Sequence, residues 1–298
     1  MTSPLDHVLR RAVITVSFHP DRLLADGLDV ASHLAADGEY HNQFRTGISN
    51  GGLGGDRPAW EDRMFPGLAP HERPVYGALN LAGYPDGASP RFGSCHLVLS
   101  PAVSSRATFS HGDSSTLPSA VGTAAAFGAI RDALLDQVST TGQALNLAAP
   151  SAAAWVAALG AARSAPGRAL DDYVEAQIHG GLRVAQDVTA VVADASFRRT
   201  RFEPLLGRLG PPLSWSPSFR LKAGEFPADL RGPSVPPLAA AIASRYGVAL
   251  LDAEVIGRAA RSVVRDPGAW SSFGYPAEVL QLIKYLWHIL VLRGDWTC

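Results

Sequence analysis

Cysteine and lysine are scarce in this chain of 298 residues, and each scarcity narrows the class of protein. Cys95 and Cys298 are the two cysteines, so a disulfide framework is excluded and a reducing compartment is favoured. Lys222 and Lys284 are the lysines, and positive charge is carried almost wholly by arginine. The formal net charge of -1 gives no overall electrostatic signature of nucleic-acid or acidic-membrane binding.

Long hydrophobic runs and a signal peptide are also missing. The nearest candidate for a membrane span is 279–292, where Lys284 and His288 interrupt the apolar residues. The first residues lack the charged and apolar regions of a signal peptide. We therefore expect a cytoplasmic protein, or one exported without a cleavable N-terminal signal, with no membrane partner.

Several familiar catalytic and binding motifs are absent. No lysine follows the glycines in the Walker pattern, and the glycine spacing does not fit the Rossmann fingerprint. Ser49 lacks the G-x-S-x-G frame of a hydrolase elbow. The histidines show neither H-E-x-x-H nor C-x-x-C companions, so a zinc site would need residues from distant segments, and we expect no metal.

A hydrophobic content of 47% is enough for a substantial core. Period-2 alternation or short apolar runs predict strands, and 3.6-residue periodicity with caps predicts helices. The strands are expected at 12–18, 75–81, 95–99, 173–179 and 188–192. The helices are expected at about 28–37, in an alanine-rich region from 120 to 165, and at 238–246, 253–264 and 277–292. This mixture, with strands and helices segregated, indicates an α+β fold.

The domain organisation follows from the same pass. Residues 1–202 are expected to form a β-rich core that carries a helical insert at 118–168. Residues 203–298 are expected to begin with a Pro/Gly-rich irregular connection, up to about 236, and to end in helices packed on the core.

A glycine-rich stretch, 45–56, is the most unusual segment of the chain. It contains five glycines together with Thr46, Ser49 and Asn50. Glycine permits positive φ and close approach of the backbone to a ligand, and consecutive amides can hold an anion. The segment is therefore either a ligand-binding loop or a flexible surface loop.

Polar residues at the strands supply the candidates for chemistry. His19 follows the first strand, Tyr76 projects from the second, and Glu175 and Gln177 project from one side of the 173–179 strand. A structural histidine, a half-buried tyrosine and a solvent-facing sheet edge are the alternatives. Because Glu175 is expected on an open surface, its loss is expected to change stability by no more than about 0.5 kcal/mol.

Long stretches of the sequence resemble a known bacterial family. They are Ile14-Thr15-Val16-Ser17-Phe18-His19-Pro20-Asp21-Arg22, Glu72-Arg73-Pro74-Val75-Tyr76-Gly77, Arg91-Phe92-Gly93-Ser94-Cys95, and Asp171-Asp172-Tyr173-Val174-Glu175-Ala176-Gln177. With the glycine stretch and Leu286-Trp287-His288, they resemble the family called domain of unknown function 3626. That family name implies no activity.

A looser resemblance does imply one. A histidine ending a first strand, a tyrosine on a later strand and a glutamate on a still later strand are similar to the His-Tyr-Glu class of ADP-ribosyltransferases. The resemblance implies an ADP-ribosyltransferase-like fold that uses NAD as co-substrate. It assigns His19 to the adenosine ribose, Tyr76 to nicotinamide stacking, and Glu175 to the nicotinamide ribose and its developing positive charge.

The remaining residues implied by this resemblance lie around the cofactor. Gln177 would orient the acceptor without adding negative charge. The other residues expected at NAD are Arg22, Gln43, Thr46, Gly47, Ser49, Asn50, Gly51 and Asn80. Many members of the class carry Glu-x-Glu or Gln-x-Glu, whereas this chain has Glu175-x-Gln177. If Gln177 held the catalytic position, the chain would bind NAD without cleaving it.

The expected function is transfer of ADP-ribose from NAD to a macromolecular acceptor, either protein or nucleic acid, or hydrolysis of NAD. An antitoxin or immunity protein is a candidate partner for such an effector. One alternative is a metal-dependent hydrolase that uses His19, Asp21, Asp56 and other scattered His and Asp residues. The other is a non-enzymatic binding module.

Overall fold

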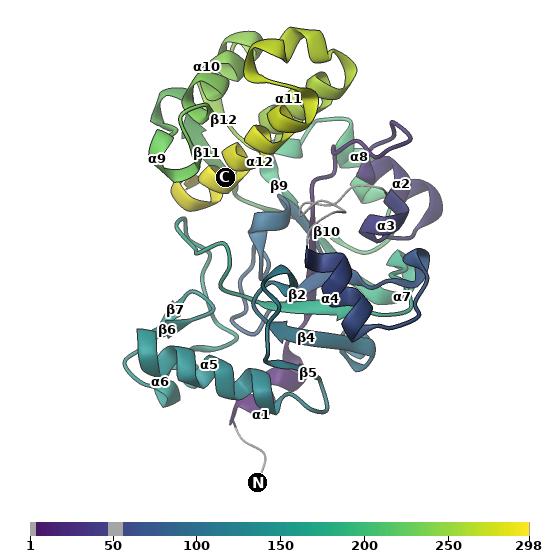
Figure 1. The fold of residues 1–298 in the computed structure, drawn as a ribbon, viewed down its shortest axis with the longest axis vertical. Helices are drawn as coiled ribbons and strands as arrows, with labels where there is room; N and C mark the ends of the chain where they lie inside the picture. The colour runs from purple at the N-terminus through teal and green to yellow at the C-terminus, as the bar shows by residue number, and fades with distance from the viewer. Residues whose placement is uncertain (1–3, 47–55, 298) are drawn as a thin grey trace.

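The computed structural model describes residues 4–46 and 56–297, which form a mixed α+β structure around one large sheet (Figure 1). In spatial order, the strands of this sheet are β10 (Leu213–Ser216), β9 (Val188–Asp194), β3 (Cys95–Leu99), β1 (Ile14–Phe18), β2 (Val75–Leu79), β8 (Val174–Ile178), β4 (Ala107–His111) and β5 (Val121–Thr123). Neighbouring strands are antiparallel except for the parallel pair β9–β10. The five strands expected from the sequence are all present, and they lie side by side in the order β9, β3, β1, β2, β8.

The strand register brings polar side chains together on one face. Thr15 of β1 is paired with Ala78 of β2, which is paired in turn with Glu175 of β8. Tyr76 of β2 is paired with Gln177 of β8. Because directly opposed residues share a face and side chains alternate along a strand, these five residues lie on the same side of the sheet.

The other side of the sheet is apolar and buried. It includes Ile14 and Val16 from β1 and Val174, Ala176 and Ile178 from β8, each at most 1% exposed. This alternation confirms the periodicity read from the sequence for both strands. It also fixes the register, because a shift by one residue would place the polar set in the core.

Strand β8 differs from its sequence interpretation in one important respect. A solvent-facing edge was one alternative for its polar side, but β8 lies between β2 and β4, and all five of its residues are buried. Glu175 is 2% exposed and Gln177 is 1% exposed. The expectation that Glu175 occupies an open surface is therefore wrong, because covering segments close over the polar face as well.

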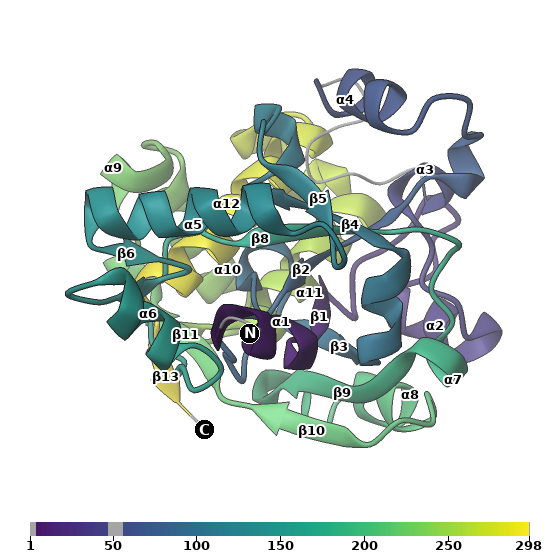
Figure 2. The ribbon, with the colours of Figure 1, turned by 90° about the horizontal axis from the view of Figure 1, so that it is seen from below.

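Helices surround the sheet at both ends of the molecule. The first eight are α1 (Pro4–Arg11), α2 (Val30–Asp37), α3 (Gln43–Thr46), α4 (Asp56–Met64), α5 (Gly128–Thr141), α6 (Ala152–Ala158), α7 (Val184–Asp187) and α8 (Phe202–Gly207). Helices α1, α5 and α6 gather at the end of the molecule opposite the C-terminal helices (Figure 1). Figure 2 shows β9 and β10 along one side of the molecule and β4 and β5 toward the other.

The segment expected as a helical insert, 118–168, is helical only in part. Its first element is β5, which extends the large sheet at its edge by pairing with β4. Between α5 and α6 the chain forms a small hairpin of β6 (Gln143–Ala144) and β7 (Leu147–Ala148). The alanine-rich composition concealed these short strands because they contain few β-branched residues.

The segment from 203 to 236 is more regular than its Pro/Gly content indicates. It contains β10, β11 (Ser218–Lys222) and α9 (Ala228–Arg231). Because β10 pairs in parallel with β9, the large sheet continues past residue 202. The expected irregular connection is thus replaced by strands whose pairing partners lie elsewhere in the sequence, a feature that local composition does not reveal.

The C-terminal helices agree closely with the sequence interpretation. They are α10 (Val235–Tyr246), α11 (Ala253–Arg265) and α12 (Pro276–Arg293). Asp252 caps α11 by accepting a hydrogen bond from the Val255 amide at 3.1 Å. Beside them β11 pairs with β12 (Leu250–Leu251) and β13 (Asp295–Thr297). Within residues 4–46 and 56–297, no helix is long and apolar enough to cross a membrane.

Candidate functional site

A cleft of about 220 Å³ opens beside the polar face of the sheet. Its walls come from β1, β2, β8, α2, the segments 39–46 and 89–92, and α12. Six residues that the sequence singled out line this cleft: His19, Arg22, Gln43, Thr46, Tyr76 and Glu175. Residues far apart in the chain therefore meet at one place, as the sequence interpretation required.

Glu175 and Gln177 have different positions relative to the cleft. Glu175 lines it, whereas Gln177 does not. Gln177 Nε2 donates hydrogen bonds to Glu175 Oε1 at 3.0 Å and to Ser110 Oγ at 3.1 Å, and its Oε1 accepts from Thr108 Oγ1 at 3.0 Å. Gln177 is thus a buried residue that orients the Glu175 carboxylate, and β4 fixes Gln177 in turn.

Tyr76 is held by a carboxylate that sequence reasoning did not single out. Its hydroxyl donates a short hydrogen bond to Oε1 of Glu61, a fully buried residue of α4. Glu61 also accepts hydrogen bonds from Arg73 Nη1 at 3.2 Å and from Gln43 Nε2 at 3.3 Å. This network fixes the ring of Tyr76 at the cleft and uses Gln43 as part of the support.

His19 is the third candidate residue at the cleft, and its imidazole is kept uncharged. Its Nδ1 lies 3.2 Å from Ser94 Oγ, and its ring makes an edge contact with Trp287 of α12 at 5.1 Å between centroids. Burial, with a further contribution from Arg22, lowers the pKa of His19 to about 3. At neutral pH the imidazole therefore acts as a neutral hydrogen-bonding group.

The position of Ser94 depends on a close backbone approach at Gly93. A Cβ added to Gly93 would lie 2.3 Å from the backbone nitrogen and carbonyl carbon of Phe18. Only glycine lets the turn at 90–94 lie this close to the end of β1. The same turn carries Arg91 into the cleft wall.

Positive charge gathers along the cleft. Arg22, Arg91 and Lys284 all line it. Burial, followed by repulsion from Arg91 and Arg22, lowers the pKa of Lys284 to about 8, while Asp113 opposes this shift. Arg91 pairs with Asp171 and lies 3.6 Å from Asp113. The arrangement provides a cationic wall (Arg22, Arg91 and Lys284) suited to an anionic ligand.

Sequence reasoning had a partial signal for this wall. Lys284 interrupts the apolar run of α12, and Arg91 opens the string 91–95 that carries part of the family resemblance, but neither residue lies on a polar strand face. Trp287 is 2% exposed, as a core residue would be, and it also contacts His19.

Some expected site residues lie outside the cleft or outside the described chain. Asn80 does not line it. Its side chain holds a turn, because Oδ1 accepts from the amides of Gly83 at 3.1 Å and Tyr84 at 2.9 Å. The residues Gly47, Ser49, Asn50 and Gly51 lie outside the described residues, so the expected contribution of the glycine stretch stays a prediction.

Of the residues named for a metal-dependent hydrolase, His19 lines the cleft, whereas Asp21 does not. The side chain of Asp56 lies outside the described part of the chain. Asp21 is 1% exposed and forms an ion pair with Arg261 of α11. Burial raises the pKa of Asp21 to about 7. Asp21 therefore connects the end of β1 to the C-terminal helices, and its carboxylate does not face His19 across the cleft.

A family model described as "Protein of unknown function (DUF3626)" matches residues 13–292. The chain belongs to this family. No curated protein matches it. All the residues that line the cleft fall within the range matched to DUF3626, including Lys284 of α12, so the C-terminal helices are part of the same family unit as the sheet.

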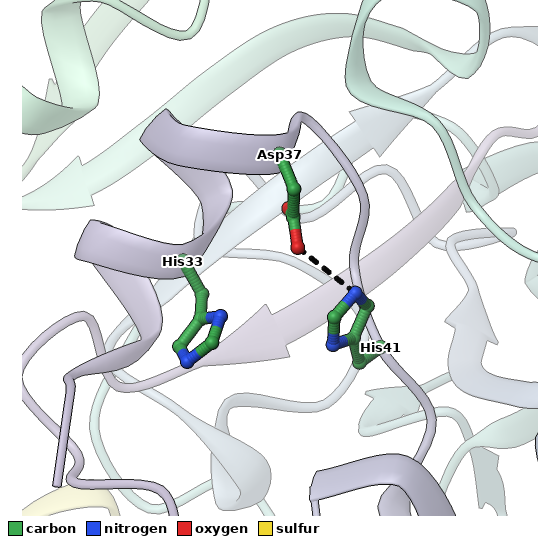
Figure 3. Close-up of side chains that lie close together, drawn as sticks. All are labelled: His33, Asp37 and His41. Carbon is green, nitrogen blue, oxygen red and sulfur yellow. Dashed lines mark ion pairs between the residues drawn. The ribbon is translucent and has the colours of Figure 1, made fainter. Parts of the chain in front are cut away.

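A second group of polar residues lies on the cleft wall of this DUF3626 protein. The side chains of His33, Asp37 and His41 lie close together (Figure 3). Their spacing of four and four residues is visible in the sequence, but the histidines were interpreted as scattered. His33 and His41 also line the cleft.

Proposed function

We propose that this protein cleaves the nicotinamide–ribose bond of NAD and transfers ADP-ribose to a macromolecule or to water. The observation that carries the proposal is the convergence on one cleft of His19, which directly follows β1, Tyr76 of β2 and Glu175 of β8. These three strands are direct neighbours in the sheet. We infer from the same arrangement that the sheet is ADP-ribosyltransferase-like.

Glu175 provides the main chemical contribution in this proposal. As the bond between C1′ and the nicotinamide nitrogen breaks, its electron pair leaves with nicotinamide and positive charge develops on the ribose. A fixed carboxylate in a water-poor site stabilises that charge strongly. The acceptor nucleophile then bonds to C1′ and loses its proton to solvent or to a neighbouring base.

The support around Glu175 suits this role. Gln177 holds one carboxylate oxygen at 3.0 Å, so the carboxylate needs little reorganisation during the reaction. Tyr76 presents its ring to the cleft while Glu61 holds its hydroxyl. His19, neutral because its pKa is lowered to about 3, can bond a ribose hydroxyl without adding charge.

We expect the cationic wall to bind the part of NAD that His19, Tyr76 and Glu175 do not contact. Arg22, Arg91 and Lys284 can attract the pyrophosphate of NAD, because guanidinium and ammonium groups bind phosphate oxygens. The cleft volume of about 220 Å³ is below the roughly 300–1,000 Å³ usual for ligand pockets. We therefore expect part of the dinucleotide to extend beyond the cleft.

Nicotinamide release from NAD tests the proposal. Glu175→Gln keeps the size of the side chain and removes its charge, so the rate is expected to fall by about 100- to 1,000-fold. Glu278→Gln is the matched control, because Glu278 is exposed and glutamine also serves at that position of a capping box. Its rate is expected to equal that of the wild type.

The other outcomes separate the alternative functions. Equal nicotinamide release by wild type and Glu175→Gln would overturn the proposal. Turnover of another substrate that requires a divalent metal and ignores Glu175 would favour the hydrolase. Absence of any nucleotide turnover, with Tyr76→Ala and Glu175→Ala both retaining partner binding, would favour the binding module. The acceptor, whether protein or nucleic acid, and an antitoxin or immunity partner would follow from mass spectrometry of modified and co-purified species.

A further inference from the structure

The His33–Asp37–His41 cluster is built by one short helix and the turn that ends it. His33 and Asp37 are four residues apart on α2, so they lie on the same side of the helix. Gly38 ends α2 with φ +68°, and its amide donates to Leu34 O at 3.1 Å. This left-handed turn brings the chain back so that His41 faces the helix (Figure 3).

The backbone around the cluster is fixed by neighbouring segments. The Val184 amide donates to Gly38 O, and the Tyr40 amide donates to Leu182 O, each at 2.8 Å. The N-cap residue Asp29 accepts from the Ser32 amide at 2.9 Å at the other end of α2. A site whose side chains stand on such a fixed backbone is pre-organised for a ligand.

The donor atoms converge on one another at close range. One potential ligand atom from each of His33, Asp37 and His41 lies within 4.8 Å of the other two. In a tetrahedral zinc site with bonds of about 2.0–2.2 Å, ligand atoms are about 3.4 Å apart. Small side-chain rotations are therefore enough to close the cluster around an ion.

The His41 ring lies beside Asp37 but is not held there by a hydrogen bond. Its Nε2 is buried and lies 3.0 Å from Asp37 Oδ2. It nevertheless makes no hydrogen bond with any residue in the described ranges. A nitrogen and a carboxylate oxygen that are adjacent but misaligned for a hydrogen bond can both direct lone pairs at a third atom.

The His33 ring is held by the carboxylate of Asp26, which is not one of the three cluster residues. Its Nε2 lies 2.7 Å from Asp26 Oδ2. With Nε2 facing Asp26, Nδ1 is the ring nitrogen of His33 that remains for the cluster. A carboxylate behind a ligating histidine is a common companion of metal sites.

We propose that His33, Asp37 and His41 bind a divalent transition-metal ion, with Zn²⁺ as the best match. Two imidazole nitrogens and one carboxylate oxygen are ligands that zinc accepts, and they leave a fourth position open. Because His33 and His41 line the cleft that Arg22 also lines, an ion held by them would add positive charge to the cleft wall. The site departs from the sequence expectation of no metal, and it does not rest on the proposed NAD chemistry.

Equilibrium dialysis of the full chain against ZnCl₂, after removal of metal by a chelator, tests the proposal without NAD. The wild type is expected to bind one Zn²⁺ per chain. His33→Ala and His41→Ala are each expected to weaken binding by at least about 100-fold, because each removes a ligand. Asp26→Asn is expected to weaken it by about 10-fold, which is typical for loss of an outer partner.

The control and the contrary outcome use the same measurement. His71→Ala removes an exposed histidine outside the cluster and is expected to bind Zn²⁺ as the wild type does. Circular dichroism checks that all variants are folded. Zn²⁺ binding that is absent from the wild type, or unchanged in the His33→Ala/His41→Ala double variant, would overturn the proposal.

Discussion

The cleft has a floor and a rim that are built in different ways. The floor carries His19, Tyr76 and Glu175, which reach the cleft only because β1, β2 and β8 pair in one register. The rim carries His33, Asp37 and His41, all within nine consecutive residues of one helix and its turn. The floor therefore depends on long-range pairing, whereas the rim depends on local geometry.

The two regions also differ in how completely they are enclosed. Glu175 and Gln177 are at most 2% exposed and are linked to β4 through hydrogen bonds. Asp37 is exposed, and both rim histidines are half-buried. A substitution in the floor should thus change the stability of the whole fold, while a substitution in the rim should change local binding alone.

The largest expected change in the free energy of unfolding comes from replacing two glycines by alanine, one beside the floor and one at the rim. In Gly93→Ala, the new Cβ would lie 2.3 Å from the Phe18 backbone, so β1 and the 90–94 turn must separate. We expect a loss of about 3 kcal/mol in the free energy of unfolding. In Gly38→Ala at the rim, nothing lies within 4 Å of the Cβ, and the positive φ alone should cost about 1 kcal/mol. Urea denaturation measures both, and equal losses would contradict the contrast.

A second pair of variants compares a polar side chain beneath the floor with one at the rim. Gln177→Ala removes three buried side-chain hydrogen bonds, to Thr108, Ser110 and Glu175. The unfolding free energy should fall by about 2 kcal/mol, because buried partners are left unsatisfied. Asp37→Ala removes an exposed side chain and should change it by less than about 0.5 kcal/mol. A loss at Asp37 as large as that at Gln177 would show that the rim supports the fold.

The smallest effect concerns a buried histidine behind the cationic wall. His288 is 2% exposed, neither ring nitrogen bonds to a described residue, and burial followed by Arg231 lowers its pKa to about 3. Below pH 6.5 the unfolded chain binds a proton that the folded chain does not, so the wild type loses stability as pH falls toward 3. His288→Leu removes this loss.

The stability of His288→Leu relative to the wild type should therefore rise as the solution is acidified. Between pH 6 and pH 5 the difference should grow by about 1 kcal/mol, in the direction that favours the variant. Thermal or urea unfolding at a series of pH values measures it. Parallel pH–stability curves for the two proteins would show that His288 is not shielded from protons.

Sequence patterns predicted the floor better than the rest of the cleft. Alternation placed Tyr76 and Glu175 on polar faces because a strand has a strict period of two. It did not reveal that the polar face of β8 is itself covered, since burial of that face depends on segments far away in the sequence. Alternation also did not distinguish Glu175, which lines the cleft, from Gln177, which lies on the same face of the sheet but does not line the cleft.

The other omissions have similar physical causes. Strand β10 is short, lies in a Pro/Gly-rich region and is paired only with β9, so no local signal marks it. Arg91 and Lys284 reach the cleft from a turn and from a distant helix, where neither residue belongs to a repeating pattern. The rim was within reach of the sequence, because two residues four apart before a helix-ending glycine must share a helix face.

The placement of α12 limits how this polypeptide can be shortened. Lys284 lines the cleft, Trp287 contacts the His19 ring, and β10 extends the sheet beyond residue 202. A fragment that stops at 202 would keep the three floor side chains in its sequence yet lose a wall and a sheet edge. Deletion libraries and protease nicking should thus find no shorter fragment that keeps the whole cleft, and the C-terminal third must be carried along in any transplanted version of the site.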